Sequence, residues 1–339
     1  MLKGHQSWIF ENKPTLLSSA SVVGPFEGRG PLGKDFDIIH GDSLLGQDSW
    51  EKAEKTMMED AAKKAMEKAG LTKDQIHFYV GGDMMNQITS SSFAARTLSM
   101  PYIGVFGACS TSMESLALAS LIVDSHSAKY VLCGTCSHNS SAEKQFRYPT
   151  EYGSQKPPTA QYTVTGAGAA VVSSEGEGPK ILSATMGRIV DMGIKDPFNM
   201  GAAMAPAAVD TIQAHCRDLG ITPDYYDLIA TGDLSKVGYA LVKDLFKKHE
   251  FPIENTKYVD CGMMIYDYDK QMVQSGGSGC ACCAVVTYGH LLNRLKKGEW
   301  KRILIVATGA LLSPITFQQG ESIPCIAHAV AIENGVSSS

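Results

Sequence analysis

The chain has few of the features that direct a protein to a membrane or to nucleic acid. It contains no apolar run close to the ~18 residues that a membrane-spanning helix needs. Its start, Met1 to Ser7, has no hydrophobic signal core. The net charge is −5, so there is no basic footprint for nucleic acid. We therefore expect a soluble protein made in a cytosol, with no nucleic-acid partner, which works at a membrane only if a partner holds it there.

Disulfide and metal patterns are missing as well. The nine cysteines are an odd number with clustered spacing, which suggests reduced thiols in a chain without a signal segment. Cys133 and Cys136, followed by His138, could bind a metal or do redox work, but Cys133 lies in a strand-like run and no second pair appears. The cysteines within 280–283 lie at a helix start rich in small residues, which favours close packing over metal binding. We expect no metal and no cofactor.

What the chain does have is enough apolar residues for large cores. Its 339 residues are 44% hydrophobic and 19% charged, which fits two domains or one large duplicated domain. An amphipathic helix is predicted over 49–69, where apolar residues recur at i, i+4 spacing. The continuous apolar run 76–80 predicts a strand covered on both faces. The class is therefore α/β.

The second half of the chain repeats the order of the first. The stretch 74–83 aligns with 224–233, which matches Asp83 with Asp233, and each copy is a strand that ends in Gly-Asp after a helix. We interpret this as a duplication of one α/β unit. The first unit is expected over residues 1–175 and the second over 176–339.

The functional prediction depends on a cysteine between a strand and a helix. A strand-like run over 102–106 precedes Cys109, and a helix-like run over 115–124 follows it. Small neighbours let the backbone approach a ligand, and the helix N-terminus favours the thiolate, which makes Cys109 a candidate nucleophile. The alternative is a buried cysteine that packs as a small hydrophobic residue. The motif alone does not decide between the two.

The segment 137–162 is polar, aromatic and proline-bearing, and it has no clear periodicity. Its length predicts a functional loop or a covering flap. Four of its residues could form a flap over a ligand, or equally a dimer or partner surface. They are Arg147, Tyr148, Glu151 and Tyr152.

Three stretches carry a resemblance to a known fold. They are Gly107-Ala108-Cys109-Ser110, the small-residue strand 165–170, and the run 303–310 that ends in Thr-Gly-Ala. Together they resemble the thiolase-like fold over nearly the whole chain, and 144–153 is similar to the stage V sporulation protein AD family of spore-forming bacteria. The resemblance implies a duplicated α/β fold, in which two mixed β-sheets and their helices form five α-β-α-β-α layers.

The chain departs from the condensing enzymes of this fold where those enzymes hold their catalytic partners. A ketoacyl synthase pairs its acyl-accepting cysteine with two histidines, or with a histidine and an asparagine. The first position falls in 231–236 and the second in 275–280, and neither segment contains the required residue. The turn 308–310 lacks the second cysteine of a thiolase. We expect a protein that is not an enzyme, with Cys109 as a vestigial nucleophile, although Cys280 or His138 could replace the missing groups from another direction.

The family resemblance implies a binding protein for dipicolinic acid, free or as its calcium chelate, in the former acyl pocket. Helix N-termini at Cys109 and Cys280 are natural sites for its carboxylates, and Lys236 could add a positive charge. Asp233 is unfavourable for a dianion; it suits the calcium chelate, or it only caps the helix that begins at 234. His138 is either a donor at the pocket edge or a loop residue exposed to water. The predicted ligand-binding residues are Cys109, Ser110, His138, Thr231, Asp233, Lys236, Gly277, Ser278 and Gly309.

The resemblance also implies partners and a location. We expect the protein to act with small membrane proteins of the same sporulation operon, moving dipicolinic acid into the forming spore and out at germination. It would be made in the cytoplasm of the forespore and lie peripherally on the spore inner membrane. Thiolase-like folds usually pair through the edge strand of the first sheet, so a homodimer is expected. Two alternatives stay open: an acyl-transfer enzyme that uses Cys109, and a purely structural subunit of a membrane assembly.

Overall fold

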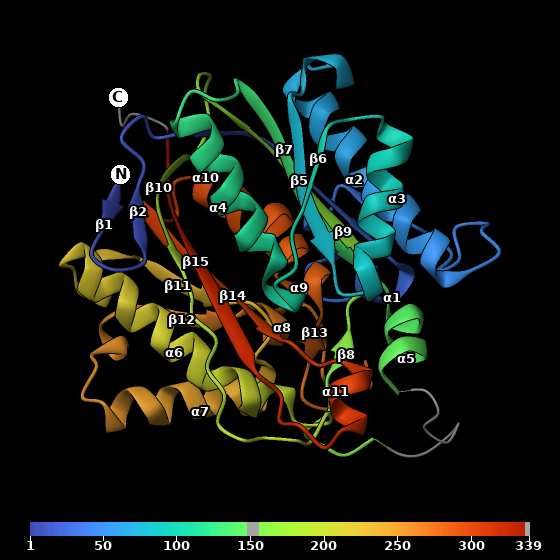
Figure 1. The fold of residues 1–339 in the computed structure, drawn as a ribbon, viewed down its shortest axis with the longest axis vertical. Coiled ribbons are helices and arrows are strands. Elements are labelled where there is room, and N and C mark those ends of the chain that lie inside the picture. Colours follow the sequence, from blue (N-terminus) through green and yellow to red (C-terminus); the bar gives the residue numbers. More distant parts are fainter. Residues whose placement is uncertain (148–155, 336–339) are drawn as a thin grey trace.

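The computed structural model describes residues 1–147 and 156–335, and its strands fall into two halves that share one order (Figure 1). The first half runs as β6 (Tyr102–Gly104), β5 (Phe78–Asp83), β7 (Tyr130–Ser137), β9 (Gly166–Ser173) and β3 (Thr15–Val23). The second runs as β12 (Lys257–Asp260), β11 (Leu228–Thr231), β14 (Arg302–Ala310), β15 (Cys325–Glu333) and β10 (Lys180–Met186). In each half the first three strands are parallel and the last two pair antiparallel with their neighbours. The repeated order is that of a duplicated unit, while the boundary after residue 175 remains a prediction.

The two halves meet edge to edge. Lys180 of β10 pairs with Thr15 of β3, and this single pair joins the two five-stranded ladders into one path. Short strands that branch from the path complete a sheet of 13 strands. The two mixed sheets expected from the sequence are therefore connected at one point.

Helices form three layers around these strands. α2 (Trp50–Ala69) and α3 (Thr89–Leu98) pack on the outer face of the first half, and α6 (Met200–Leu219) packs on the second half with α7 (Ser235–Lys248) beside it. α4 (Thr111–Asp124) and α9 (Cys280–Val285) lie between the halves (Figure 1). α4 contacts strands of both halves. This gives the five layers that the resemblance implied.

The central and outer helices differ in composition because they differ in burial. α4 buries nine of its 14 residues and α9 buries all six, and most of these side chains are small, which lets the helices approach closely. α9 continues through a π-helical turn, Val286–Leu291, into α10 (Leu292–Lys296), which together form the predicted helix 280–296. The outer helix α2 buries one face, begins at the Ser49 cap and ends at Gly70, whose φ is 66°.

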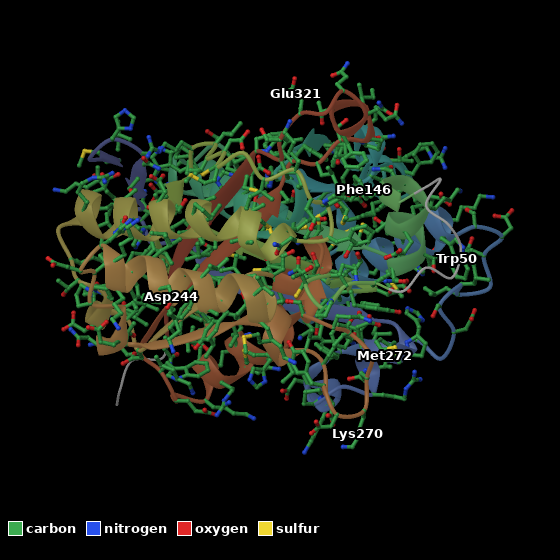
Figure 2. All side chains as sticks on the ribbon, turned by 90° about the horizontal axis from the view of Figure 1, so that it is seen from below. Trp50, Phe146, Asp244, Lys270, Met272 and Glu321 are labelled. Atoms are coloured by element: carbon green, nitrogen blue, oxygen red, sulfur yellow. The ribbon has the colours of Figure 1, made fainter. Side chains whose placement is uncertain are left out.

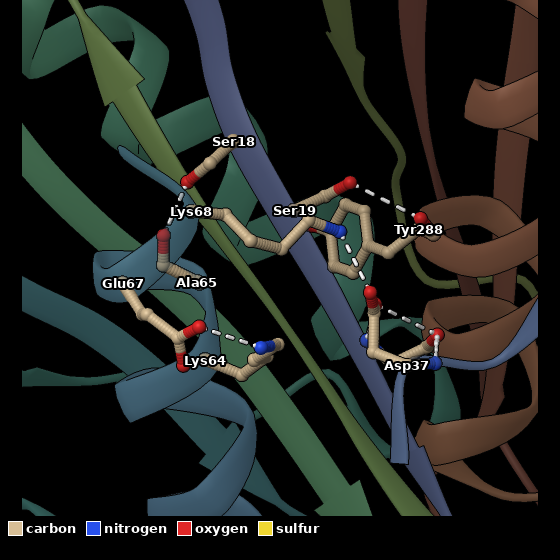
Figure 3. A network of polar contacts seen from close by, with 9 residues as sticks. Ser18, Ser19, Asp37, Lys64, Ala65, Glu67, Lys68 and Tyr288 are labelled. Carbon is tan, nitrogen blue, oxygen red and sulfur yellow. Dashed lines mark hydrogen bonds and ion pairs between the residues drawn. The ribbon is translucent and has the colours of Figure 1, made fainter. Parts of the chain in front are cut away.

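Polar side chains of β3 fix helices on both faces of the sheet. Ser18 Oγ donates to the carbonyl oxygen of Ala65 in α2 at 2.6 Å, and Ser19 Oγ donates to that of Tyr288 in the π-helical turn at 3.1 Å (Figure 3). Successive strand residues face opposite sides of a sheet. This pair of serines therefore ties one strand to an outer helix and to the central layer at once.

The segment 137–162 differs most from its prediction. Where a loop was expected, α5 (Asn139–Arg147) forms directly after β7, and β8 (Tyr162–Thr163) pairs with β13 (Gly277–Ser278). The helix has few apolar residues and is positioned by distant segments, so its own sequence gave little periodic signal. Tyr148, Glu151, Tyr152 and the side chain of Arg147 lie outside the described residues.

Short elements complete the described chain. They are β1 (Leu2–Lys3), β2 (Ser7–Ile9), α1 (Pro25–Gly28), β4 (Ile38–Ile39), α8 (Cys261–Met264) and α11 (Pro314–Gln318). Nothing among the described helices combines the length and the apolar character that crossing a bilayer requires.

Candidate functional site

The turn before α4 places Cys109 at the junction of the two halves. Residues Ala108–Ser110 form a 3₁₀ turn in which Ala108 has a φ of 49°, and Cys109 is only 5% exposed. Ser110 Oγ donates to the carbonyl oxygen of Gly107 at 2.6 Å, and Thr111 Oγ1 donates to that of Ala108 at 2.7 Å. The small polar residues around the cysteine thus hold a strained turn in place.

The thiol of Cys109 faces a carboxylate. The Asp233 carboxylate lies near the sulfur and accepts from Thr308 Oγ1 at 2.6 Å, from Ser278 Oγ at 3.0 Å and from the backbone N–H of Gly279 at 3.0 Å. Burial, followed by the charge of Asp233, raises the pKa of Cys109 well above its ordinary value. Burial and the nearby carboxylate thus both favour the thiol over the thiolate, so the candidate nucleophile stays a prediction that the site does not favour. Gly279, which precedes α9, also gives its N–H to Asp233 instead of to a ligand.

Asp233 faces the sulfur because another residue caps α7. Asp260, at the end of β12, accepts from the backbone N–H groups of Leu234 and Ser235, both at 2.9 Å, and from Thr231 Oγ1 at 2.7 Å. Burial raises the pKa of Asp260 to about 6, against the effect of these donors. The prediction that Asp233 caps this helix is wrong, and the capping residue lies on a different strand.

A small cavity, partly open to solvent, lies beside Cys109. Its walls come from both halves and are mostly apolar, with three phenylalanines and two methionines. The lining residues are Met84, Phe106, Ala108, Cys109, Ala142, Glu143, Phe146, Gln161, Thr163, Pro197, Phe198, Met200, Ser278, Ala310 and Leu312. The charged member, Glu143, is paired with Lys156 at 2.9 Å. Among the described residues, neither histidine nor asparagine lines this cavity.

Four predicted residues lie around the site without lining the cavity. The Ser110 side chain holds the turn, and Thr231 bonds Asp260. The carbonyl oxygen of Gly277 accepts from Ser235 Oγ at 2.7 Å. Gly309 lies so close to the turn that a Cβ there would be 2.2 Å from the carbonyl oxygen of Gly107. Their roles in ligand binding stay predictions, whereas their structural contacts are clear.

Two predicted residues point elsewhere. His138 is buried, its Nε2 lies 2.9 Å from the carbonyl oxygen of Ser43, and its ring lies against Trp50. It is therefore neither at the cavity wall nor exposed, and burial lowers its pKa. Lys236 is exposed, with Nζ 3.5 Å from the centre of the Tyr268 ring. Of the nine predicted residues, the structure brings together Cys109, Asp233 and Ser278.

Sequence reasoning missed most of the cavity wall. Thr308 belongs to the run 303–310 that carried the resemblance. Its bond to Asp233 was not predicted, because the sequence of that run does not show which distant residue it contacts. Gln161 Nε2 donates to the backbone carbonyl of Asp233 at 2.5 Å, across 72 positions of sequence. Apolar residues such as Phe146 and Phe198 gave no signal, because isolated aromatics in irregular segments have no periodicity.

The described residues hold no cluster of three or more histidine, cysteine or acidic side chains suited to a metal. Cys133 and Cys136 lie on one strand: the first contacts the Tyr288 hydroxyl and the second contacts Glu54. These partners lie in different helices, on opposite faces of β7. All nine cysteines are buried and unpaired.

Comparison with known proteins gives a consistent family. The family model described as stage V sporulation protein AD matches residues 4–333. The stage V sporulation protein AD of Bacillus subtilis (strain 168) is 52% identical over 332 residues, which are 98% of this chain and 98% of that protein.

Solved structures with a similar fold are condensing enzymes. The 3-oxoacyl-[acyl-carrier-protein] synthase III of Aquifex aeolicus VF5 has a TM-score of 0.56 at 15% identity, covering 94% of this chain and 99% of that chain. A variant of Xanthomonas campestris OleA bound with cerulenin has a TM-score of 0.63 at 17% identity, covering 96% and 97%. At these identities the likeness shows the thiolase-like fold alone.

Proposed function

The chain belongs to the stage V sporulation protein AD family, and from this premise we propose that it binds dipicolinic acid in the cavity beside Cys109 without catalysing a reaction. The family places the protein in sporulation. The finer function rests on the site. The observation that carries it is the buried Asp233 carboxylate near the Cys109 thiol, held by Thr308, Ser278 and the Gly279 N–H at the place where a condensing enzyme needs a proton-transfer group.

This arrangement is unfavourable for acyl transfer. A thiol held next to a carboxylate stays protonated, and the thiolate is the nucleophile. The Asp233 carboxylate already accepts from three donors, which hold it in place instead of leaving it available to an incoming acyl group. Loss of a positioned acid–base group alone lowers a rate by about 10²–10⁴-fold. A binding role uses the same cavity without needing either property.

The cavity suits a small flat acid. Phe106, Phe146 and Phe198 in its lining provide faces against which a pyridine ring can pack. Hydroxyl and amide groups from Thr163, Ser278 and Gln161 share the lining and are the kind of polar groups that orient carboxylates. Both the free acid and its calcium chelate are candidates for the bound form.

We further propose that the protein acts peripherally at the spore inner membrane, with small membrane proteins of its operon, as a homodimer. β6 is the last strand of the first half, and Ile103 and Phe106 at this edge are 38% and 50% exposed. An exposed apolar strand edge favours pairing with a second copy.

Isothermal titration calorimetry with sodium dipicolinate, alone and with equimolar calcium chloride, tests the binding function. We expect saturable binding by the wild-type chain and by Cys109→Ser, which keeps the size of the side chain. Cys109→Trp fills the cavity and should abolish binding. No heat at millimolar dipicolinate in either titration would reject the proposal.

Two alternatives have their own readouts. An acyl adduct on Cys109 after incubation with acyl-CoA, found by mass spectrometry, would favour the acyl-transfer enzyme. Normal sporulation and normal dipicolinic acid uptake in cells carrying Cys109→Trp would favour a purely structural subunit.

A further inference from the structure

One wall of the cavity is built differently from the others. α5 supplies Ala142, Glu143 and Phe146 to the lining, opposite segments that belong to the packed layers. It lies at the periphery, at the end of the molecule where Phe146 and Trp50 are found, away from Asp244 of α7 (Figures 1 and 2). Among the helices and strands of the described chain, it packs mainly on α2 and β8.

Polar side chains hold α5 in place. Lys144 pairs with Glu51 of α2 at 2.6 Å. Gln145 Nε2 donates to the carbonyl oxygen of Met84 at 3.2 Å, and its Oε1 accepts from the N–H of Asn86 at 2.9 Å. None of the α5 side chains that the structure describes belongs to the three hydrophobic clusters of the core. A helix attached in this way separates from the body more easily than α4 or α2 does.

One attachment of α5 is a fully buried bond between two side chains. Ser141 Oγ donates to Glu54 Oε2 of α2 at 2.5 Å, and both residues are fully buried. Glu54 Oε1 accepts from the Cys136 thiol, and Asp83 lies close enough to raise the pKa of Glu54, after burial, to about 8. Since a serine hydroxyl can donate to a carboxylate or accept from a carboxylic acid, the bond persists in both protonation states.

We propose that α5 is a lid that opens to admit the ligand, and that the Ser141–Glu54 bond is its latch. This inference rests on the proposed function, because the ligand used to test it is dipicolinate. Opening separates α5 from α2 and from the 84–86 segment, and it uncovers the wall that Phe146 forms. Glu54 is then a positioning residue, which acts on the ligand only through α5.

A lid has a kinetic signature. Weakening the latch raises the open population while the closed form still dominates, so association and dissociation accelerate together and the affinity changes little. Loss of one buried hydrogen bond corresponds to a change of about tenfold. A wall that merely packs against the ligand gives a different result, in which only dissociation accelerates and the affinity falls.

The test is stopped-flow mixing of the full chain with sodium dipicolinate, followed by tryptophan fluorescence, for the wild type and for Ser141→Ala. We expect both rate constants to rise about tenfold, with a dissociation constant within about twofold of wild type. Ser140→Ala is the matched control. The side chain of Ser140 is half-buried, and the bond to Glu54 comes from Ser141 instead. Equal rates for the two variants, or faster dissociation alone, would overturn the inference while leaving the binding function intact.

Hydrogen exchange gives a readout without ligand. Amides of 140–146 should exchange about tenfold faster in Ser141→Ala than in Ser140→Ala, while α4 stays far better protected than α5 in both variants. Unaltered exchange in α5 would also overturn the inference. If dipicolinate fails to bind the wild type, the proposed function fails, and the exchange experiment still decides whether α5 opens.

Discussion

Asp83 and Asp233 occupy matching places in the two halves, at the end of β5 and just after β11. Their carboxylates nevertheless bind different kinds of partner. Asp83 accepts from the N–H groups of Met85 at 2.9 Å and Ser91 at 2.7 Å, and so supports the start of α3. Asp233 accepts from side chains around the cavity and lies near the thiol of Cys109. The difference arises because Asp260 has taken over the capping of the neighbouring helix in the second half. A duplicated backbone thus leaves one of its two aspartates available for a site.

Removing the cap in the second half should have the largest effect. Asp260→Ala removes the acceptor of the Leu234, Ser235 and Met263 N–H groups, while the Thr231 hydroxyl keeps other contacts, so we expect a loss of ~4 kcal/mol in the free energy of unfolding. Urea denaturation measures this loss. Asp83→Ala, which unpairs two N–H groups, should cost ~2–3 kcal/mol. A smaller loss for Asp260→Ala than for Asp83→Ala would contradict the assignment of the caps.

The raised pKa of Glu54, which lies near Asp83, predicts that the free energy of unfolding depends on pH. Burial and Asp83 raise the pKa of Glu54 from 4.5 to about 8, so the unfolded chain releases this proton first and stability falls as the pH rises from 4.5 to 8. Glu54→Gln keeps the bond to Ser141 but does not titrate. We expect it to be ~3 kcal/mol more stable than wild type at pH 8.5 and close to wild type at pH 4.5. If the free energies of unfolding of wild type and Glu54→Gln changed with pH in parallel, Glu54 would not have a raised pKa in the folded protein.

The charge of Asp233 should control the reactivity of Cys109. Asp233→Asn removes a negative charge near the sulfur, which lowers the pKa of the thiol and should speed alkylation by iodoacetamide at pH 8 about tenfold or more. Peptide mapping by mass spectrometry follows modification at Cys109 alone. Asp83→Asn is the matched control and should leave the rate within about twofold. Equal rates in the two variants would mean that Asp233 does not govern the sulfur.

The smallest effect is expected at Lys236. Its ammonium group packs on Tyr268 at the surface, so Lys236→Ala should change the affinity for dipicolinate by less than about twofold and stability by ~0.5 kcal/mol. Lys243→Ala, whose ammonium group lies 5.6 Å from the Tyr239 ring, is the control in calorimetry. A loss of affinity of tenfold or more in Lys236→Ala alone would place this lysine in the binding site.

The fold was largely predictable because its signals are local. Continuous apolar strands, the i, i+4 stripe of α2 and the Gly-Ala-Cys-Ser turn are each visible in a short window. The position of Cys109 at the turn and its closeness to Ser278 followed from the resemblance. α5 escaped prediction because its attachment depends on Glu54, which is far away in sequence.

The direction of side chains was less predictable than their position. Asp233 is a good helix cap by residue type, and only the competing carboxylate of Asp260, which comes from another strand, turns it toward the sulfur. Lys236 follows Asp233 closely in sequence, but it points outward because Tyr268 offers its ring there. His138 is polar and directly follows a strand, yet it is covered by Trp50 and by the backbone at Ser43. The direction of each of these side chains depends on residues far away in the sequence, which a short window does not contain.

The close packing at Gly309 limits how the two halves of the chain can evolve. It belongs to the second half, yet any side chain there would collide with the backbone of Gly107 in the first, so the two copies of the ancestral unit limit each other at this point. After such a contact has formed, neither copy can change freely, even when the chemistry that once took place between them has been given up. Steric fit between the duplicates can therefore preserve the shape of the cavity between them, whatever takes place inside it.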